Sequence, residues 1–223
     1  MMQIEINKLV RSKRRTIALI VERDGSLTVR APRRAAVVDI HAFILEKQDW
    51  IIRAREKFKS VAAAPKKEYK DGESFLFLGS EYELALVKPQ RPALKFENGF
   101  TLGSTAQNKG ERIFVQWYKE QAYTVIAERV RLFSAQFGFS PKQVKISSAR
   151  TRWGSCSPDG TLTFTWRLVM APLEVIDYVV VHELVHLRVK DHSSRFWREV
   201  EKIMPDYKNC RKWLRVHGEK LNL

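Results

Sequence analysis

The stretch that decides the fold is Val180-Val181-His182-Glu183-Leu184-Val185-His186-Leu187, an apolar run that carries two histidines and one glutamate. Its HExxH pattern is typical of a metal site on a helix, because residues i and i+4 lie on the same helix face. The imidazoles of His182 and His186 can therefore point at one ion. Glu183 lies one step round the helix, near enough to handle a water on that ion without binding the ion itself.

A third ligand is expected shortly after this stretch. Zinc in hydrolases typically has three protein ligands and one open position for water, and His192 is the natural third residue. We expect it on a tight corner between the metal helix, residues 173–188, and a second helix that Ser193 caps. The alternative is a structural histidine pair on an amphipathic helix. The nearly continuous apolar flanks argue against it, because buried imidazole and carboxyl groups need partners.

Composition predicts a globular cytoplasmic protein. The 223 residues suffice for one large domain or two small ones, and 44% of them are hydrophobic. The two cysteines, Cys156 and Cys210, do not make a disulfide framework and fit a reducing compartment. The first residues lack the apolar segment of a signal peptide, and no apolar run is long enough to cross a membrane. We therefore expect no membrane partner.

The chain is strongly basic, with a formal net charge of +15. Charge of this sign favours polyanions such as nucleic acids, nucleotides or anionic surfaces. A local cluster comprises Lys8, Arg11, Lys13, Arg14 and Arg15. Since no nucleic-acid reader motif accompanies the charge, it predicts at most weak, non-specific nucleic-acid or nucleotide binding.

Residues 1–104 are predicted to form an N-terminal α+β region that is rich in strands. Strand-like runs occur at residues 4–6, 17–21, 27–29 and, with interruptions, 73–103. Hairpin turns are expected at Asp24-Gly25, Gly79-Ser80 and Asn98-Gly99. Apolar residues spaced by three and four predict one helix over residues 36–59, which a connector at residues 62–67 follows.

Residues 105–223 are predicted to form the catalytic region, and the chain as a whole is expected to be α+β. A long helix over residues 111–137 precedes two strands, at residues 144–147 and 162–166. The turn Ser157-Pro158-Asp159-Gly160 joins the second strand to the segment before it. The metal helix and two shorter helices complete the region.

The combination of motifs in this half resembles the YgjP-like family of zinc metallopeptidases, which is related to the SprT and WLM zincins. The motifs are Arg152-Trp153-Gly154-Ser155-Cys156, Trp166-Arg167-Leu168, Tyr178 to Leu187, and His192-Ser193. The resemblance extends over nearly the whole chain and implies a zincin-like C-terminal half. It also implies that His182, His186 and His192 bind zinc and that Glu183 is the catalytic acid and base. Thr165 departs from the asparagine expected before the tryptophan.

Three functions are compatible with such a site. The first is zinc-dependent hydrolysis of peptide bonds in a peptide or protein substrate. The second, which the family labels also suggest, is pyrophosphohydrolysis of a nucleoside triphosphate such as UTP; Arg150, Arg152 and Lys190 would suit phosphates, but no glycine-rich phosphate loop accompanies them. The third is a nucleic-acid-associated protease of the SprT kind. The segment Arg152–Cys156 is either a substrate-binding edge strand or a turn that stabilises a hairpin.

Overall fold

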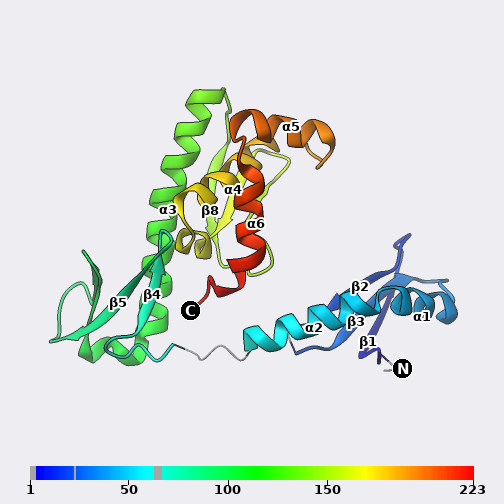
Figure 1. The fold of residues 1–223 in the computed structure, drawn as a ribbon, viewed down its shortest axis with the longest axis horizontal. Coiled ribbons are helices and arrows are strands. Elements are labelled where there is room, and N and C mark those ends of the chain that lie inside the picture. The colour runs from blue at the N-terminus through cyan, green and yellow to red at the C-terminus, as the bar shows by residue number, and fades with distance from the viewer. Residues whose placement is uncertain (1–3, 23, 63–66) are drawn as a thin grey trace. The chain divides into compact units, whose positions relative to one another are not determined.

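The chain divides into two compact units, Met1–Lys66 and Lys67–Leu223. The computed structural model describes residues 4–22, 24–62 and 67–223, and Figure 1 shows the elements of each unit. Each unit has its own hydrophobic core. The sequence led us to expect the division after residue 104. The strands of residues 74–103 instead pack on the long helix that follows them, so they are part of the second unit. Among the described helices, none is long and apolar enough to cross a bilayer.

The first unit combines a three-stranded sheet with two helices. Its elements are β1 (Lys8–Ser12), β2 (Ala18–Val21), β3 (Leu27–Pro32), α1 (Val37–Glu46) and α2 (Gln48–Ala62). β3 is the central strand and pairs parallel with β1 and antiparallel with β2. Alternate residues of β3 meet apolar residues of the helices in the core, which contains Leu27, Val29, Ala31, Ile40, Ile44 and Ile51.

The first unit differs from the sequence prediction in three places, one of which is β1, a strand that was not predicted at residues 8–12. The Asp24-Gly25 turn between β2 and β3 is confirmed, with Gly25 at a φ of 82°. Ile4 is buried in the core, but residues 4–6 form no strand. The single helix predicted over residues 36–59 is two helices, because the backbone leaves the helical region at Lys47 (φ −99°, ψ 14°). Most of the connector predicted at residues 62–67 lies outside the described residues.

The second unit begins with a four-stranded sheet in the order β4-β5-β7-β6. Its elements are β4 (Ser74–Phe77), β5 (Ser80–Val87), β6 (Leu94–Phe96) and β7 (Phe100–Gly103), followed by a 3-10 helix (Ser104–Lys109) and α3 (Gly110–Phe137). Aromatic rings join sheet to helix: the rings of Phe75 and Phe114 stack with centroids 4.2 Å apart. The Asn98-Gly99 hairpin and the long helix are confirmed. The turn between β4 and β5 lies one residue earlier than predicted, at Leu78-Gly79.

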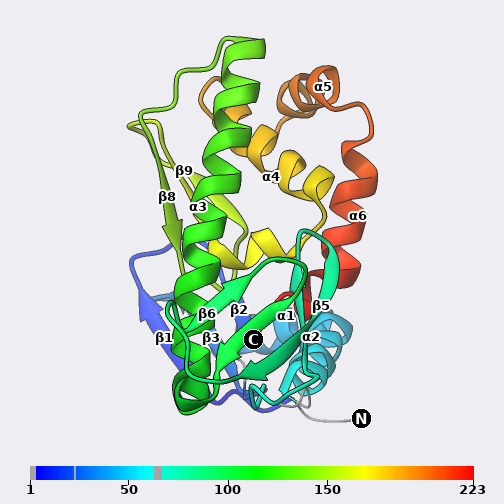
Figure 2. The ribbon, with the colours of Figure 1, turned by 90° about the vertical axis from the view of Figure 1, so that its left-hand side faces the viewer.

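The remainder of the second unit holds a three-stranded sheet and the C-terminal helices. Its elements are β8 (Gln143–Ser147), β9 (Gly154–Cys156), β10 (Thr161–Thr165), a 3-10 helix (Trp166–Met170), α4 (Leu173–Val185), α5 (Ser194–Ile203), α6 (Tyr207–His217) and a 3-10 helix (Gly218–Lys220). The strand order is β8-β10-β9, so β10 is central. Figure 2 shows α4 between α3 and α6. The described residues therefore form a mixed α+β fold, as predicted.

Candidate metal centre

Helix α4, which carries the HExxH residues, is fixed at its start by the β4–β5 turn. The amide of Leu78 donates to the carbonyl of Val169 (2.9 Å), and the amide of Gly79 donates to Met170 (3.1 Å). A Cβ on Gly79 would lie 2.8 Å from Cγ of Pro172, directly before α4. Only glycine permits this approach together with its φ of 84°. The first sheet of the second unit thus positions the helix that carries the HExxH residues.

An ion pair fixes the middle of α4 against α3. Arg129 donates from Nε and one terminal nitrogen to the two carboxylate oxygens of Asp177, at 2.5 and 2.7 Å. The pair is largely buried, with side-chain exposures of 21% and 13%. Asp177 raises the pKa of Arg129 through this hydrogen bond. Bidentate contacts of this kind fix the relative orientation of the two side chains as well as their distance.

Three imidazoles converge at the end of α4. His182 lies on the helix, His186 is its C-cap residue, and His192 lies on the loop before α5. Nε2 of His192 is 3.0 Å from Nε2 of His182 and 3.2 Å from Nε2 of His186. The predicted corner therefore brings all three side chains together. Ser193 occupies the predicted N-cap position, although its side chain makes no capping hydrogen bond.

The three histidines fit a tetrahedral metal ion. One ligand atom from each lies within 4.8 Å of the others. Two nitrogens bound tetrahedrally at typical zinc distances would be about 3.3 Å apart, close to the 3.0 and 3.2 Å separations found here. Neutral imidazole nitrogens suit zinc and several other divalent transition metals. The donor set and spacing therefore fit the group that the sequence predicted.

The protonation states of the imidazoles also suit metal binding. Burial, with the neighbouring histidines and Arg211, lowers the pKa of His182 to about 3, and burial lowers that of His186. Nδ1 of His186 lies 3.0 Å from the carbonyl of Val189. A proton on Nδ1 can be donated there, which leaves the lone pair of Nε2 directed at the other two rings. Both helix histidines are thus neutral at pH 7, as ligands must be.

Glu183 lies beside the triad and is 5% exposed. Burial raises the pKa of Glu183 to about 7, and the positive charge of Arg152 opposes this. The backbone of Gly154 in β9 lies against its carboxylate: a Cβ on Gly154 would be 2.6 Å from Oε1. The backbone of β9 therefore packs directly against the Glu183 carboxylate, next to the histidines.

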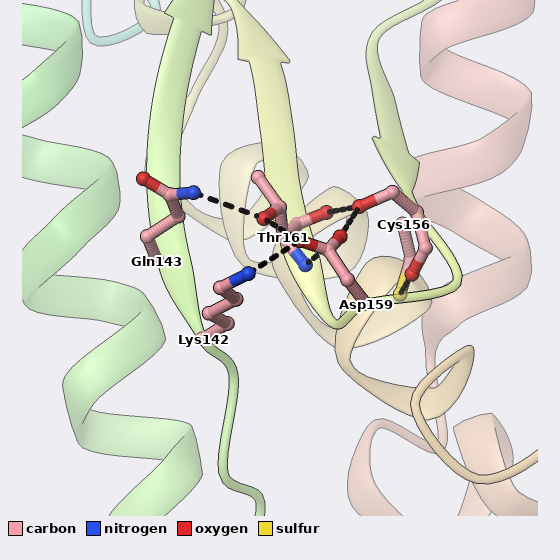
Figure 3. A network of polar contacts seen from close by, with 6 residues as sticks. Lys142, Gln143, Cys156, Asp159 and Thr161 are labelled. Carbon is pink, nitrogen blue, oxygen red and sulfur yellow. Dashed lines mark hydrogen bonds and ion pairs between the residues drawn. The ribbon is translucent and has the colours of Figure 1, made fainter.

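The β9–β10 hairpin that presents Gly154 ends in a tight polar turn. Asp159 accepts hydrogen bonds from the Ser157 hydroxyl (2.5 Å), the Lys142 ammonium (2.9 Å) and the Thr161 hydroxyl (3.2 Å). Figure 3 shows Lys142, Asp159 and Thr161 converging at the end of the hairpin, with Cys156 at the adjoining strand. Gly160 follows with a φ of 84°, as the predicted turn requires. The turn thereby holds β9 in register with β10.

The motifs around this site match a known family. The sequence matches the YgjP-like, metallopeptidase domain family over residues 15–217. The chain belongs to this YgjP-like metallopeptidase family. A solved structure, that of the metallopeptidase zymogen of Pyrococcus abyssi abylysin, is 27% identical over 42% of this chain and 93% of its own, with a TM-score of 0.38. No curated protein matches the chain.

The basic residues that the sequence placed near the site are only partly brought to it. In this YgjP-like chain, Arg152 acts electrostatically on Glu183, and Lys190 acts on His186 and on Cys156. Arg150 is exposed and has no comparable effect on the described site groups. Cys156 and Cys210 are free thiols, as expected. Burial raises the pKa of Cys156, so it is not poised as a thiolate.

Several residues around the site were not predicted from the sequence. Gly154 belongs to the segment Arg152–Cys156, but its contact with Glu183 was not predicted. Its neighbour Trp153 packs on Gly218, where a Cβ would lie 2.7 Å from the indole. Arg188 donates to the carbonyls of Phe137 and Gly138 (2.7 and 2.8 Å), which ties the corner after α4 to the end of α3. These contacts join residues far apart in sequence, so spacing alone could not reveal them.

Proposed function

We propose that this chain is a zinc-dependent metallopeptidase in which His182, His186 and His192 hold the metal and Glu183 is the general base. The observation that carries the proposal is the convergence of three imidazole nitrogens, from the end of α4 and the loop after it, next to the buried carboxylate of Glu183 in α4. Membership of a metallopeptidase family supports the reaction class. Three nitrogen ligands leave one position open for chemistry, as catalytic zinc requires.

The chain's own residues supply the proton transfers. Zinc, when bound, would polarise the scissile carbonyl and lower the pKa of water towards neutrality. Glu183 accepts a proton from the water whose oxygen bonds to the carbonyl carbon. As the carbon–nitrogen bond breaks, Glu183 returns that proton to the leaving amine. The three histidines serve only to hold the metal.

β9 is suited to hold an extended peptide in this site. It lies at the edge of the β8-β10-β9 sheet, and among the described strands it pairs only with β10. Its free side can pair with a substrate main chain, which is a common mode of peptide recognition. Gly154 brings this edge directly to Glu183. Of the two roles left open for the segment Arg152–Cys156, this placement favours the substrate-binding edge.

Nucleotide hydrolysis is the second candidate, and the positive charges of Arg152, Lys190 and Arg211 near the site groups favour it. A triphosphate, however, needs several donors that converge on its oxygens. The sequence has no glycine-rich phosphate loop to provide them. An edge strand next to the general base suits a peptide better.

The deciding experiment uses one zinc-loaded sample of the full chain and its Glu183→Gln variant. Glutamine is nearly isosteric but cannot accept the proton from water. We expect slow cleavage of an unstructured protein by the wild type, lost with chelator, restored by zinc and absent in Glu183→Gln at unchanged zinc content. Glu183-dependent release of pyrophosphate from UTP without peptide cleavage would replace the peptidase assignment with the second candidate.

A further inference from the structure

One side of the histidine triad is bordered by three stacked aromatic rings, Tyr178, Trp197 and Tyr207, called here the aromatic wall. The ring of Trp197 lies 5.8 Å from the rings of both His182 and His192. Trp197 and Tyr207 stack with centroids 5.4 Å apart at 16°, and Tyr207 stacks on Tyr178 at 6.3 Å. The wall therefore extends from α5 across α6 to α4, next to the metal ligands.

Arg211 lies on this wall. It is one helical turn after Tyr207 on α6, and its guanidinium carbon is 4.8 Å from the ring centroid of Trp197. Its side chain is exposed, and within the described part of the chain it has no carboxylate partner. Arg129, by contrast, is held by Asp177 in a structural ion pair. A cation without an ion-pair partner, stacked on a ring that borders the triad, is available for an anionic group.

The charge of Arg211 reaches the site. Its guanidinium stacks on Trp197, whose ring lies 5.8 Å from the rings of both His182 and His192. Lys208 also lies over a ring of the wall, 5.6 Å from the centroid of Tyr207, but it is paired with Glu201. Arg211 is thus the wall's cation without an ion-pair partner among the described residues.

We propose that Arg211 is a specificity-determining residue that binds a carboxylate of the peptide substrate, either an acidic side chain or the terminal carboxylate, beside the bond to be cut. The inference rests on the proposed peptidase function. A guanidinium presents a planar fork of donors that matches a carboxylate, and stacking on Trp197 restricts that fork to fewer orientations. One guanidinium bordered by apolar rings does not provide the several donors that a triphosphate requires.

The test measures binding rather than turnover. The zinc-loaded full chain is titrated by calorimetry with dicarboxylic acid monohydroxamates of increasing linker length, in which the hydroxamate binds the metal and the carboxylate is free. Each is compared with the matched compound whose carboxylate is replaced by an amide. At the best linker length, we expect the carboxylate to bind at least roughly tenfold tighter than the amide, as for a hydrogen bond to a charged group.

Three variants separate the contribution of Arg211 from that of general charge. Arg211→Gln should abolish the preference for the carboxylate while the affinity for the amide stays unchanged, and Arg211→Lys should retain part of the preference. Lys212→Gln removes the same charge from the next residue of α6, which is also exposed. This variant should keep the full preference for the carboxylate over the amide. Because Arg211 is exposed, these substitutions should leave folding intact.

The remaining outcomes overturn the inference in distinguishable ways. If no linker length favours the carboxylate, or if the preference survives Arg211→Gln, Arg211 does not bind substrate carboxylates although the metal centre stands. If Arg211→Gln instead weakens UTP binding and leaves the preference for the carboxylate unchanged, Arg211 binds phosphate groups and not substrate carboxylates. If neither hydroxamate binds the zinc-loaded chain, the metal centre itself is wrong, and the inference is lost with it.

Discussion

Gly154 and Glu183 are in such close contact that a Cβ on the glycine would lie 2.6 Å from Oε1 and 2.7 Å from Cγ of the glutamate. Atoms do not approach this closely without displacement, and both residues have little freedom to move. Glu183 is 5% exposed on a helix anchored at its start and middle. Gly154 is paired with Phe164 in the sheet. The position of the Glu183 carboxylate, the proposed general base, therefore depends on the absence of a side chain at residue 154.

Gly154→Ala should displace the Glu183 carboxylate and lower peptidase activity by about a hundredfold, since a misplacement near 1 Å can have that effect. The extra methyl should also reduce the free energy of unfolding by about 1–3 kcal/mol. Zinc content should persist, because the histidines are untouched. Gly99→Ala is the matched control: its Cβ would make only an ordinary contact, 3.4 Å from the carbonyl of Glu83. Full activity in Gly154→Ala would show that Glu183 tolerates the shift or is not the base.

The Arg129–Asp177 pair leads to a prediction about stability. Arg129→Ala leaves Asp177 largely buried without its two hydrogen bonds at 2.5 and 2.7 Å. We expect the free energy of unfolding to fall by about 2–3 kcal/mol in urea denaturation, as for the loss of partners from a partly buried charge. Lys202→Ala breaks the exposed pair with Glu199 and should cost less than about 0.5 kcal/mol. An equal loss of unfolding free energy in both variants would mean that the burial of the Arg129–Asp177 pair does not add to stability.

The sequence predicted those features that depend on local spacing. His182 and His186 share a helix face by the i, i+4 rule, and Ser193 marked the start of α5, which placed His192 on the corner. The break at Lys47 was missed because the apolar spacing continues through it in register. The pair Arg129–Asp177 joins residues 48 positions apart. Such contacts are set by tertiary packing, which periodicity does not report.

Replacing His182, His186 or His192 by alanine should remove most bound zinc in each case, because two nitrogen ligands hold the metal far less firmly than three. Zinc per chain is measured after dialysis against a weak chelator. His41→Ala serves as the control, since this exposed histidine lies in the first unit. If His192→Ala retained full stoichiometry and affinity, the third ligand would be elsewhere.

The net charge of +15 leads to a prediction about polyanions. Any binding to duplex DNA should be weak and independent of sequence, and it should decline steeply with salt. Each phosphate that is neutralised contributes a slope of about −0.9 in log affinity against log salt concentration. Fluorescence anisotropy with two unrelated duplexes across a salt series measures both properties. Salt-resistant binding, or a strong preference for one duplex, would favour a nucleic-acid-associated function.

The hairpin turn next to the site should be sensitive to acid. Hydrogen bonds from Ser157, Lys142 and Thr161 hold the pKa of Asp159 below its ordinary value of 3.8. A carboxyl group whose pKa is lower in the folded state stabilises that state above its unfolded pKa, and the contribution is lost as pH falls through the folded pKa. Asp159→Asn should therefore lower Tm most at neutral pH, and the difference from wild type should shrink steadily as pH falls below about 4. Glu81→Gln is the control, because this exposed carboxylate makes no side-chain hydrogen bond or ion pair among the described residues. A Tm difference that stayed constant from neutral to acid pH would show that the charge of Asp159 does not stabilise the turn that holds β9 beside Glu183.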